Sequence, residues 1–192
     1  MPPRIGVVLA GGLGARFGKP KGEVVFHGRT LAQCAAEVLW PLCTGVLVSI
    51  RAGGRNPAPD LIPVEDPPPA GRGPLAGILA GMEATGDADL LVLACDYPLI
   101  DTALLAHLTE AGDEGDVIML TDNNGRDHPL VAVWRRSSEG MLRAALADKR
   151  YKVRGLLGEL DVVRIGPREI PDRDLSRALT NVNMEDQLRR MS

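Results

Sequence analysis

The chain has 192 residues, which is long enough to bury a full core and close to the usual size of one domain. Hydrophobic residues make up 45%, charged residues 24% and aromatic residues 3%, which predicts an aliphatic core of the kind found in α/β layers. The formal net charge of -3 argues against a nucleic-acid or anionic-membrane partner, since such partners usually require a basic excess. We therefore expect one domain over residues 1–192.

The N-terminus and the cysteines indicate the compartment. The first four residues lead directly into an apolar run that is too short for a signal sequence or a membrane span. Cys34, Cys43 and Cys95 are odd in number, lie in apolar stretches and lack metal-site spacing. This pattern favours buried thiols over disulfides, and we expect a cytoplasmic protein.

Apolar runs typical of buried strands alternate with helical patterns along the chain. The strand-like runs are Ile5–Ala10, Gly45–Ile50, Leu61–Val64, Leu90–Ala94, Val117–Leu120, Leu130–Trp134 and Val162–Ile165. Helical patterns cover Thr30–Leu39, Pro74–Ala84, the segment between the Asp101 cap and Gly112, Ser138–Ala147 and Glu185–Arg190. This alternation predicts an α/β fold with a parallel sheet between two helical layers. Ligands of such sheets bind at the carboxyl ends of strands, so the loops after the first, third and fourth runs are candidate sites.

The loop after the first run is rich in glycine and carries basic side chains. The backbone at Gly11 and Gly12 can pass close to an anion, while Arg16 and Lys21 add the positive charge that a triphosphate needs. The spacing fits neither the P-loop nor the dinucleotide-binding fingerprint. The simpler alternative is a glycine-rich turn with solvated basic residues.

Asp96 follows the apolar run Leu90–Ala94 and precedes Pro98. A carboxylate at the end of a buried strand is a natural magnesium ligand beside substrate phosphates. The alternative is a turn residue before the proline. The position at the mouth of the sheet favours the metal ligand.

Four further segments carry polar side chains that could bind a ligand: Asp66 after the third run, the segment Arg126–Pro129, the basic run Lys149–Arg154, and Asn181–Asn183 near the C-terminus. Each also has a structural interpretation. Asp66 could be an exposed loop charge, and a histidine such as His128 is more often structural than catalytic. A basic run is commonly a solvated helix face, and Asn181 could be a cap or turn residue before the C-terminal helix.

Together these motifs resemble the nucleotidylyltransferase superfamily. The Leu-Ala-Gly-Gly start of the glycine loop, the Cys-Asp-x-Pro pattern at Asp96, Arg-Asp-His-Pro at 126–129 and Asn-Val-Asn at 181–183 are similar to the molybdenum cofactor guanylyltransferase (MobA) family, over nearly the whole chain. The resemblance implies a three-layer Rossmann-like nucleotidylyltransferase fold with a mostly parallel central sheet. It also implies Mg²⁺ dependence, with GTP and molybdenum-molybdopterin as substrates and molybdopterin guanine dinucleotide and pyrophosphate as products.

The resemblance assigns roles to individual residues. Arg16, Lys21 and Asp96 would be catalytic, with Asp96 as the metal ligand. The implied binding residues are Leu9, Ala10, Gly11, Gly12, Lys21, Ser49, Asp66, Asp96, Arg150, Asn181 and Asn183, with Lys152 or Arg154 as further candidates on the acceptor side. Ser49 departs from the asparagine that the family often has there; its hydroxyl can still donate, but it lacks the two-sided pattern of an amide.

Three alternatives stay open at this point. A cytidylyl-transferring relative or a sugar-phosphate nucleotidylyltransferase would share the same triphosphate loop. A GTP-binding adaptor that delivers the cofactor is the non-enzymatic alternative, although a pure binder needs neither Lys21 nor Asp96. The resemblance also implies transient contact with molybdenum cofactor insertion or delivery proteins.

Overall fold

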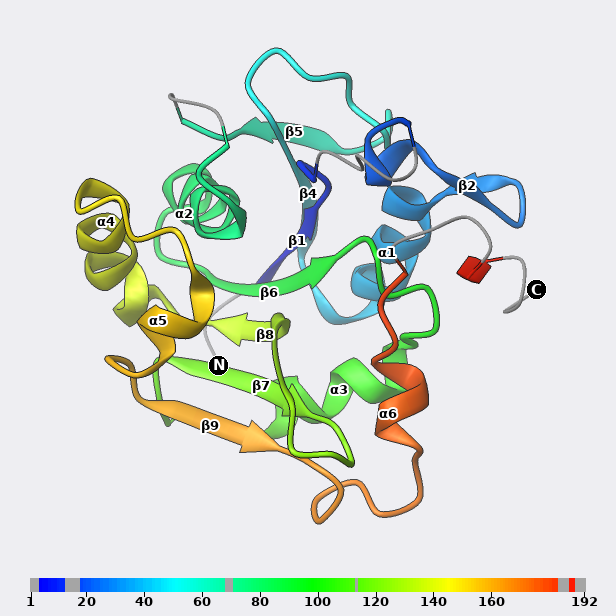
Figure 1. Ribbon diagram of the computed structural model, residues 1–192, viewed down its shortest axis with the longest axis vertical. Coiled ribbons are helices and arrows are strands. Elements are labelled where there is room, and N and C mark those ends of the chain that lie inside the picture. The colour runs from blue at the N-terminus through cyan, green and yellow to red at the C-terminus, as the bar shows by residue number, and fades with distance from the viewer. Residues whose placement is uncertain (1–3, 13–17, 68–70, 113, 183–186, 189–192) are drawn as a thin grey trace.

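One seven-stranded sheet forms the centre of the protein, with strand order β5-β4-β1-β6-β8-β7-β9. The computed structural model describes residues 4–12, 18–67, 71–112, 114–182 and 187–188 (Figure 1). The sheet strands are β1 (Arg4–Leu9), β4 (Gly45–Ile50), β5 (Ile62–Glu65), β6 (Asp89–Ala94), β7 (Val117–Thr121), β8 (Asp127–Trp134) and β9 (Val162–Ile165). A separate hairpin pairs β2 (Val25–Phe26) with β3 (Arg29–Thr30).

Helices cover both faces of the sheet, which gives the three predicted layers (Figure 1). The helices are α1 (Leu31–Leu39), α2 (Pro74–Thr85), α3 (Thr102–Glu110), α4 (Glu139–Ala147), α5 (Val153–Leu157) and α6 (Leu175–Ala178), with short 3-10 turns η1 (Lys21–Glu23), η2 (Trp40–Leu42) and η3 (Arg136–Ser138). Apolar residues of α1, α3 and α6 share one core cluster, and those of α2, α4 and α5 share the other. No helix in the described ranges is both long enough and apolar enough to span a membrane.

The central strand β6 separates the two clusters. All of its residues are buried, and their side chains alternate: Leu91 and Leu93 join the cluster of α1 and α3, while Leu90 and Val92 join the cluster of α2 and α4. A strand buried on both faces reads as a continuous apolar run, which is why the sequence reveals it so clearly. The core is aliphatic as expected, and Trp134 is its largest fully buried side chain.

Two helices begin at the residues that their caps predict. The Thr30 hydroxyl accepts the Gln33 N–H at 3.1 Å, and the Gln33 side chain accepts the Thr30 N–H at 2.9 Å, which completes a capping box at the start of α1. The Asp101 carboxylate accepts the Leu104 N–H at 2.8 Å at the start of α3. Both helices are thereby fixed at their N-termini.

The sheet is mostly parallel, but β8 runs antiparallel to both neighbours, β6 and β7. The mostly parallel sheet implied by the family resemblance is therefore confirmed, whereas the alternation of strands and helices alone does not reveal the reversal at this strand. Only the short segment 122–126 joins β7 to β8, and a parallel crossover needs a dozen or more residues. The strand is also longer than predicted, because Asp127 and His128 pair with β7 across a register shift.

Several local expectations need correction. The run Lys149–Arg154 is no helix face, because residues 149–152 form a turn and extended chain before α5 begins at Val153. The 3-10 turn η3 includes Ser138, so α4 begins one residue later than predicted. The cysteines are free thiols as expected, yet only Cys95 is fully buried. The hairpin β2–β3, α5 and α6 were not predicted, and the expected C-terminal helix lies outside the described residues except at positions 187 and 188.

Close packing of α2 against the sheet requires a glycine at position 77. A Cβ atom there would lie 2.3 Å from the Ser49 hydroxyl oxygen and 3.0 Å from Leu9 Cδ2. Real Cβ atoms do not approach other atoms so closely, so a larger residue would push the helix or the Ser49 side chain away. Gly140 in α4 is the opposite case, because a Cβ there meets no atom within 4 Å.

We therefore predict opposite effects for two glycine-to-alanine substitutions. Gly77→Ala should lower the free energy of unfolding by about 1–3 kcal/mol through overpacking. Gly140→Ala should raise it by up to about 1 kcal/mol through helix propensity. Urea denaturation of the two variants measures both values. Equal stabilisation by the two substitutions would show that α2 does not pack as closely as described.

Candidate active site at the carboxyl edge of the sheet

The carboxyl ends of β1, β4 and β6 meet at one edge of the sheet. Backbone hydrogen bonds join them there: the Ala10 N–H donates to the Ser49 carbonyl at 2.9 Å, and the Cys95 N–H donates to the Leu9 carbonyl at 3.2 Å. Because these strands are parallel and in register, the residues that follow them enter the same space. The loops after β1 and β6 are therefore neighbours despite their distance in sequence.

A cavity of about 300 Å³ opens at this edge. This volume lies at the lower end of the range typical of small-molecule sites. The cavity is lined by Leu9, Gly11, Gly12, Lys21, Ser49, Arg51, Asp66, Gly71, Gly73, Pro74, Gly77, Ala94, Cys95, Asp96 and Leu130. The structure thus brings together seven of the residues implied by the family resemblance: Leu9, Gly11, Gly12, Lys21, Ser49, Asp66 and Asp96.

An ion pair between Lys21 and Asp96 lies in this cavity. Lys21 Nζ donates to Asp96 Oδ2 at 2.9 Å, although the two residues are 75 positions apart. The side chains are 20% and 16% exposed, so the pair is largely shielded but still open to the cavity. A cation and an anion so close together can be separated by a ligand that supplies phosphate oxygens to the lysine and a cation to the carboxylate.

A second polar pair lies on the β4 and β5 side of the cavity. The Ser49 hydroxyl donates to Asp66 Oδ1 at 3.1 Å, and both residues are buried. Burial raises the pKa of the Asp66 carboxyl, and the hydrogen bond from Ser49 opposes that rise. The other carboxyl oxygen, Oδ2, faces Gly11, where a Cβ would lie 3.5 Å from it. The interpretation of Asp66 as an exposed loop charge is therefore wrong.

The N-terminus of α2 also faces the cavity, through Gly73, Pro74 and Gly77. Gly73 has a φ of 71°, which a glycine adopts readily, and Pro74 occupies the first helical position. A helix start of this kind presents unpaired N–H groups and the positive end of the helix dipole. Together with Arg51 and Lys21, it gives the cavity an environment suited to an anion. Sequence reasoning missed Arg51, which stands in the loop after β4 without a motif around it.

A buried polar network supports the segment that carries Asp96. His128 contacts the Asp122 carboxylate through Nε2 at 3.4 Å and the Tyr97 hydroxyl through Nδ1 at 3.3 Å. The Tyr97 and His128 rings meet edge to face, with centroids 5.8 Å apart. Burial lowers the pKa of His128, so the imidazole is neutral at physiological pH. The histidine of the Arg-Asp-His-Pro motif therefore contacts Tyr97, the residue that follows Asp96, and does not line the cavity itself.

The Asn181–Asn183 segment reaches the same place. The Val182 N–H donates to the Asp96 carbonyl at 2.8 Å, and the Val182 side chain is fully buried. The motif near the C-terminus thus lies beside the end of β6, but Asn181 does not line the cavity, and its role in substrate binding stays a prediction. Arg16 and Asn183, two residues implied by the resemblance, lie outside the described residues.

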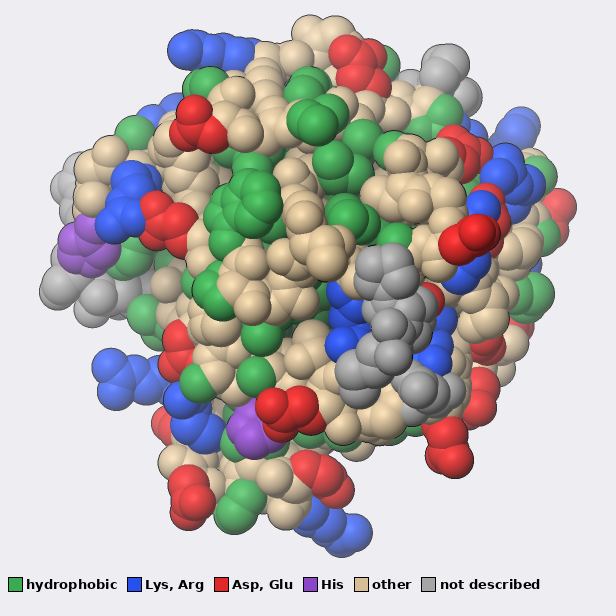
Figure 2. Space-filling view, turned by 180° about the vertical axis from the view of Figure 1, so that it is seen from behind, with side chains coloured by type: hydrophobic (Ala, Val, Ile, Leu, Met, Phe, Trp, Pro, Cys, Tyr) green, Lys and Arg blue, Asp and Glu red, His purple; other side chains and the backbone are tan. Residues whose placement is uncertain are grey.

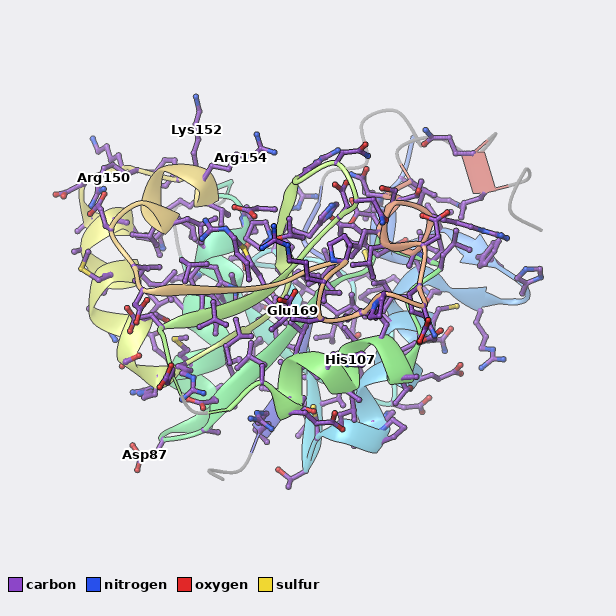
Figure 3. The ribbon with its side chains drawn as sticks, turned by 90° about the horizontal axis from the view of Figure 1, so that it is seen from below. Asp87, His107, Arg150, Lys152, Arg154 and Glu169 are labelled. Atoms are coloured by element: carbon purple, nitrogen blue, oxygen red, sulfur yellow. The ribbon has the colours of Figure 1, made fainter. Side chains whose placement is uncertain are left out.

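The remaining candidates lie away from the cavity. Ala10 is buried at the end of β1 and does not line it. Arg150 is ion-paired with Glu159 and lies 3.8 Å from Asp148, with Lys152 and Arg154 on the same α4–α5 side of the molecule (Figure 3). A role for Arg150 in acceptor binding remains a prediction.

The donor set at Asp96 fits a magnesium ion that is shared with a substrate. Within the described part of the chain, no group of three or more His, Cys, Asp or Glu side chains could hold a metal ion. Mg²⁺ commonly binds through one or two carboxylates together with substrate phosphates and water. A single carboxylate open to an anion-binding cavity meets that requirement.

Comparison with known proteins shows the family. Residues 6–163 match the family described as MobA-like NTP transferase domain. The chain belongs to the MobA-like NTP transferase family. Membership confirms the family resemblance drawn from the motifs, and it identifies the protein as a nucleotidyltransferase.

Relatives in this family cover most of the chain. The protein is 35% identical to a molybdenum cofactor guanylyltransferase from Rhizobium meliloti over 79% of this chain and 72% of the relative. It is 33% identical to a probable molybdenum cofactor guanylyltransferase from Chloroflexus aggregans, over 96% of this chain and 91% of the relative. Among solved structures, it is similar to molybdopterin-guanine dinucleotide biosynthesis protein A from Archaeoglobus fulgidus, with a TM-score of 0.78 at 25% identity over 97% and 95% of the two chains.

The buried histidine gives a prediction about pH. The pKa of His128 is lowered in the folded state from an ordinary value of 6.5. Below that pH the imidazole of the unfolded chain takes up a proton, while the buried imidazole of the folded protein stays neutral. The free energy of unfolding that His128 contributes is therefore fully present above pH 6.5 and is lost as the pH falls through the lower pKa of the folded state. His128→Gln should flatten this loss. His107→Gln, on the surface helix α3, should not.

Urea denaturation at several pH values between about 7 and 5 measures this loss of unfolding free energy. The slope is the readout, so an overall loss of stability in His128→Gln does not obscure the result. Parallel curves for the wild type and His128→Gln would contradict the assignment of a neutral buried imidazole.

Proposed function

We propose that this protein transfers GMP from GTP to the phosphate of molybdenum-molybdopterin, giving molybdopterin guanine dinucleotide and pyrophosphate. One observation carries the proposal: a cavity at the carboxyl edge of the sheet joins Gly11, Gly12, Lys21 and Asp96. The relatives that cover most of this chain are named molybdenum cofactor guanylyltransferases, which supports GTP and molybdenum-molybdopterin as the substrates.

The glycine loop and Lys21 would hold the triphosphate. Backbone N–H groups at Gly11 and Gly12 approach phosphate oxygens without hindrance from side chains. Lys21 Nζ, now 2.9 Å from Asp96, can turn its donors toward the phosphates and stabilise the negative charge that builds up on the leaving pyrophosphate. The attacking phosphate of the acceptor is already an anion, so the reaction needs no general base.

Asp96 would hold Mg²⁺ beside the substrate phosphates. When bound, the ion supplies neutralisation of phosphate charge and Lewis-acid polarisation of the reacting phosphoryl group. Asp96 would thus exchange one cation, the ammonium of Lys21, for another. The Val182 and His128 contacts would keep the Asp96–Tyr97 segment in place during this exchange.

Asp66 would select the base. The edge of guanine presents two neighbouring donors, N1–H and the 2-amino group, and a carboxylate can accept both. Cytosine presents two acceptors there, N3 and O2, and adenine presents the acceptor N1 beside a C–H group, so neither base can donate both hydrogen bonds to a carboxylate. Ser49 holds one Asp66 oxygen at 3.1 Å and leaves the other facing the cavity. This arrangement supports guanylyl transfer over the cytidylyl alternative.

A donor assay tests the function. The protein is incubated with molybdopterin, Mg²⁺ and one labelled triphosphate at a time, and the dinucleotide product is separated and counted. We expect product from GTP, little from CTP or ATP, and none after chelation of the metal. Preferred use of CTP would support the cytidylyl alternative, and GTP binding without turnover would support the adaptor.

Asp96→Asn should lower kcat by roughly 100-fold or more, because the amide keeps the size of the side chain but lacks the charge to bind a cation. The melting temperature should change little, since the substitution leaves Lys21 partly solvated. Asp87→Asn is the matched control on an exposed loop at the far end of the molecule (Figure 3). Wild-type turnover by Asp96→Asn at limiting Mg²⁺ would remove Asp96 from the metal site.

A further inference from the structure

The loop between β5 and α2 is held by one of its own side chains. It begins at Asp66, whose N–H donates to the Ile50 carbonyl at 2.9 Å, and it ends at Gly73, which precedes α2. Arg72 reaches back across this loop, and its Nη2 donates to the Pro67 carbonyl at 2.6 Å. This hydrogen bond ties the end of the loop to the residue that directly follows Asp66.

The two glycines beside Arg72 line the cavity, while Arg72 itself is not among the described residues that line it. Gly71 and Gly73 have φ values of 87° and 71°, which glycine adopts readily. The backbone therefore turns on both sides of Arg72, with the glycines toward the cavity and the guanidinium toward Pro67. From this position Arg72 cannot contact a bound nucleotide without moving.

Arg72 differs from the arginines that form ion pairs on the surface. Arg29 and Arg143, for example, are exposed and pair with carboxylates, and Figure 2 shows basic side chains beside acidic ones on one face of the molecule. Arg72 is half-buried, and its Nε is shielded from solvent without a hydrogen-bond partner among the described residues. A buried donor without a partner is costly, so its presence in the loop calls for a reason beyond packing.

The carboxylate of Asp66 supplies that reason. Burial raises the pKa of this carboxyl, and the rise is opposed by the hydrogen bond from Ser49 and by the positive charges of Arg72 and Arg51. Arg72 thus favours the ionised form of Asp66, which accepts hydrogen bonds and donates none. Among the described residues no ion pair joins Arg72 to Asp66, so the guanidinium acts on the carboxylate at longer range.

The hydrogen bonds around Asp66 restrain it from several directions. Strand β4 holds its backbone through Ile50 and its side chain through Ser49, at 2.9 Å and 3.1 Å. Arg72 adds a restraint on the C-terminal side, through the carbonyl of Pro67. A carboxylate restrained in this way loses little conformational freedom when a ligand binds, so its hydrogen bonds to the ligand discriminate more sharply.

We propose that Arg72 is a positioning residue for recognition of the base, because its hydrogen bond to Pro67 holds the Asp66 carboxylate where it meets the nucleotide. The proposal rests on the proposed function, in which Asp66 accepts N1–H and the 2-amino group of guanine. Arg72 itself touches neither the base nor the reacting phosphates. It acts through Asp66, by restraining the loop and by supplying a positive charge.

Inosine triphosphate (ITP), which lacks the 2-amino group of GTP, isolates the contact to the base. The two nucleotides share ribose and triphosphate, so the ratio of their Kd values, measured calorimetrically with Mg²⁺ and without acceptor, reports base recognition alone. Arg72→Gln, which is shorter and uncharged, should lower the preference for GTP by about 3- to 10-fold. Arg143→Gln removes the same charge from the exposed face of α4 and should keep the wild-type ratio. Equal weakening of both nucleotides in Arg72→Gln, with the ratio unchanged, overturns the proposal.

A double variant tests whether Arg72 acts through Asp66. Asp66→Asn should itself reduce the preference for GTP, and adding Arg72→Gln should then reduce it no further. A second fall of the same size as in the wild-type background would show that Arg72 acts by another route and would overturn the positioning role.

The charge of Arg72 has a separate readout in the pH dependence of the same ratio. The described charged groups near Asp66 are Arg51 and Arg72, with the Lys21–Asp96 pair in the same cavity. Protonation of Asp66 at falling pH removes the preference for GTP, and loss of a nearby positive charge raises the pKa of Asp66 further. Arg72→Gln should therefore lose the preference at a higher pH than the wild type, whereas Arg72→Lys should follow the wild type. A common midpoint for all three proteins contradicts the electrostatic role.

These binding ratios separate the proposal from the proposed function. A wild type that prefers GTP to ITP, with the preference reduced in Arg72→Gln, yet makes no dinucleotide would contradict guanylyl transfer and leave the role of Arg72 standing. A wild type that makes dinucleotide from GTP but binds GTP and ITP equally would overturn the role of Arg72 and leave the transfer standing.

Discussion

The carboxyl end of β1 is the constraint on which the rest of the site depends. Its last residues form backbone hydrogen bonds with β4 on one side and β6 on the other, through Ala10 to Ser49 and Cys95 to Leu9. These bonds bring the glycine loop, the Ser49–Asp66 pair and Asp96 to one edge. Gly77 then lets α2 approach Ser49 closely enough to complete the wall of the cavity. Overpacking at this contact would therefore disturb binding and folding together.

Electrostatics explains how two carboxylates can lie in a cavity that we propose binds phosphates. Each is compensated before any ligand arrives, Asp96 by Lys21 at 2.9 Å and Asp66 by the Ser49 hydroxyl at 3.1 Å. Their roles differ because their partners differ. In the proposed function, Asp96 exchanges the ammonium for a metal ion, whereas Asp66, held in place by Ser49, accepts hydrogen bonds from the base. Without these partners, the negative charges of the two carboxylates would repel the phosphates of the nucleotide.

Much of this site was predictable from sequence, because local patterns encode it. Buried strands read as continuous apolar runs, and Asp96 follows such a run directly. The direction of β8 was not predictable from its apolar run, since hydrophobicity carries no orientation and only the short turn to β7 determines it. Arg150 stood in a suggestive basic run, yet Glu159 and Asp148 compensate its charge.

A crystal structure with a non-hydrolysable GTP analogue and Mg²⁺ would show these roles at the level of atoms. We expect phosphates against Gly11 and Gly12, the metal on Asp96, and Lys21 Nζ moved from the carboxylate to the phosphate oxygens. We also expect the guanine edge to lie against Asp66. Nucleotide bound outside this cavity, or a Lys21–Asp96 pair still intact beside a bound triphosphate, would contradict these roles.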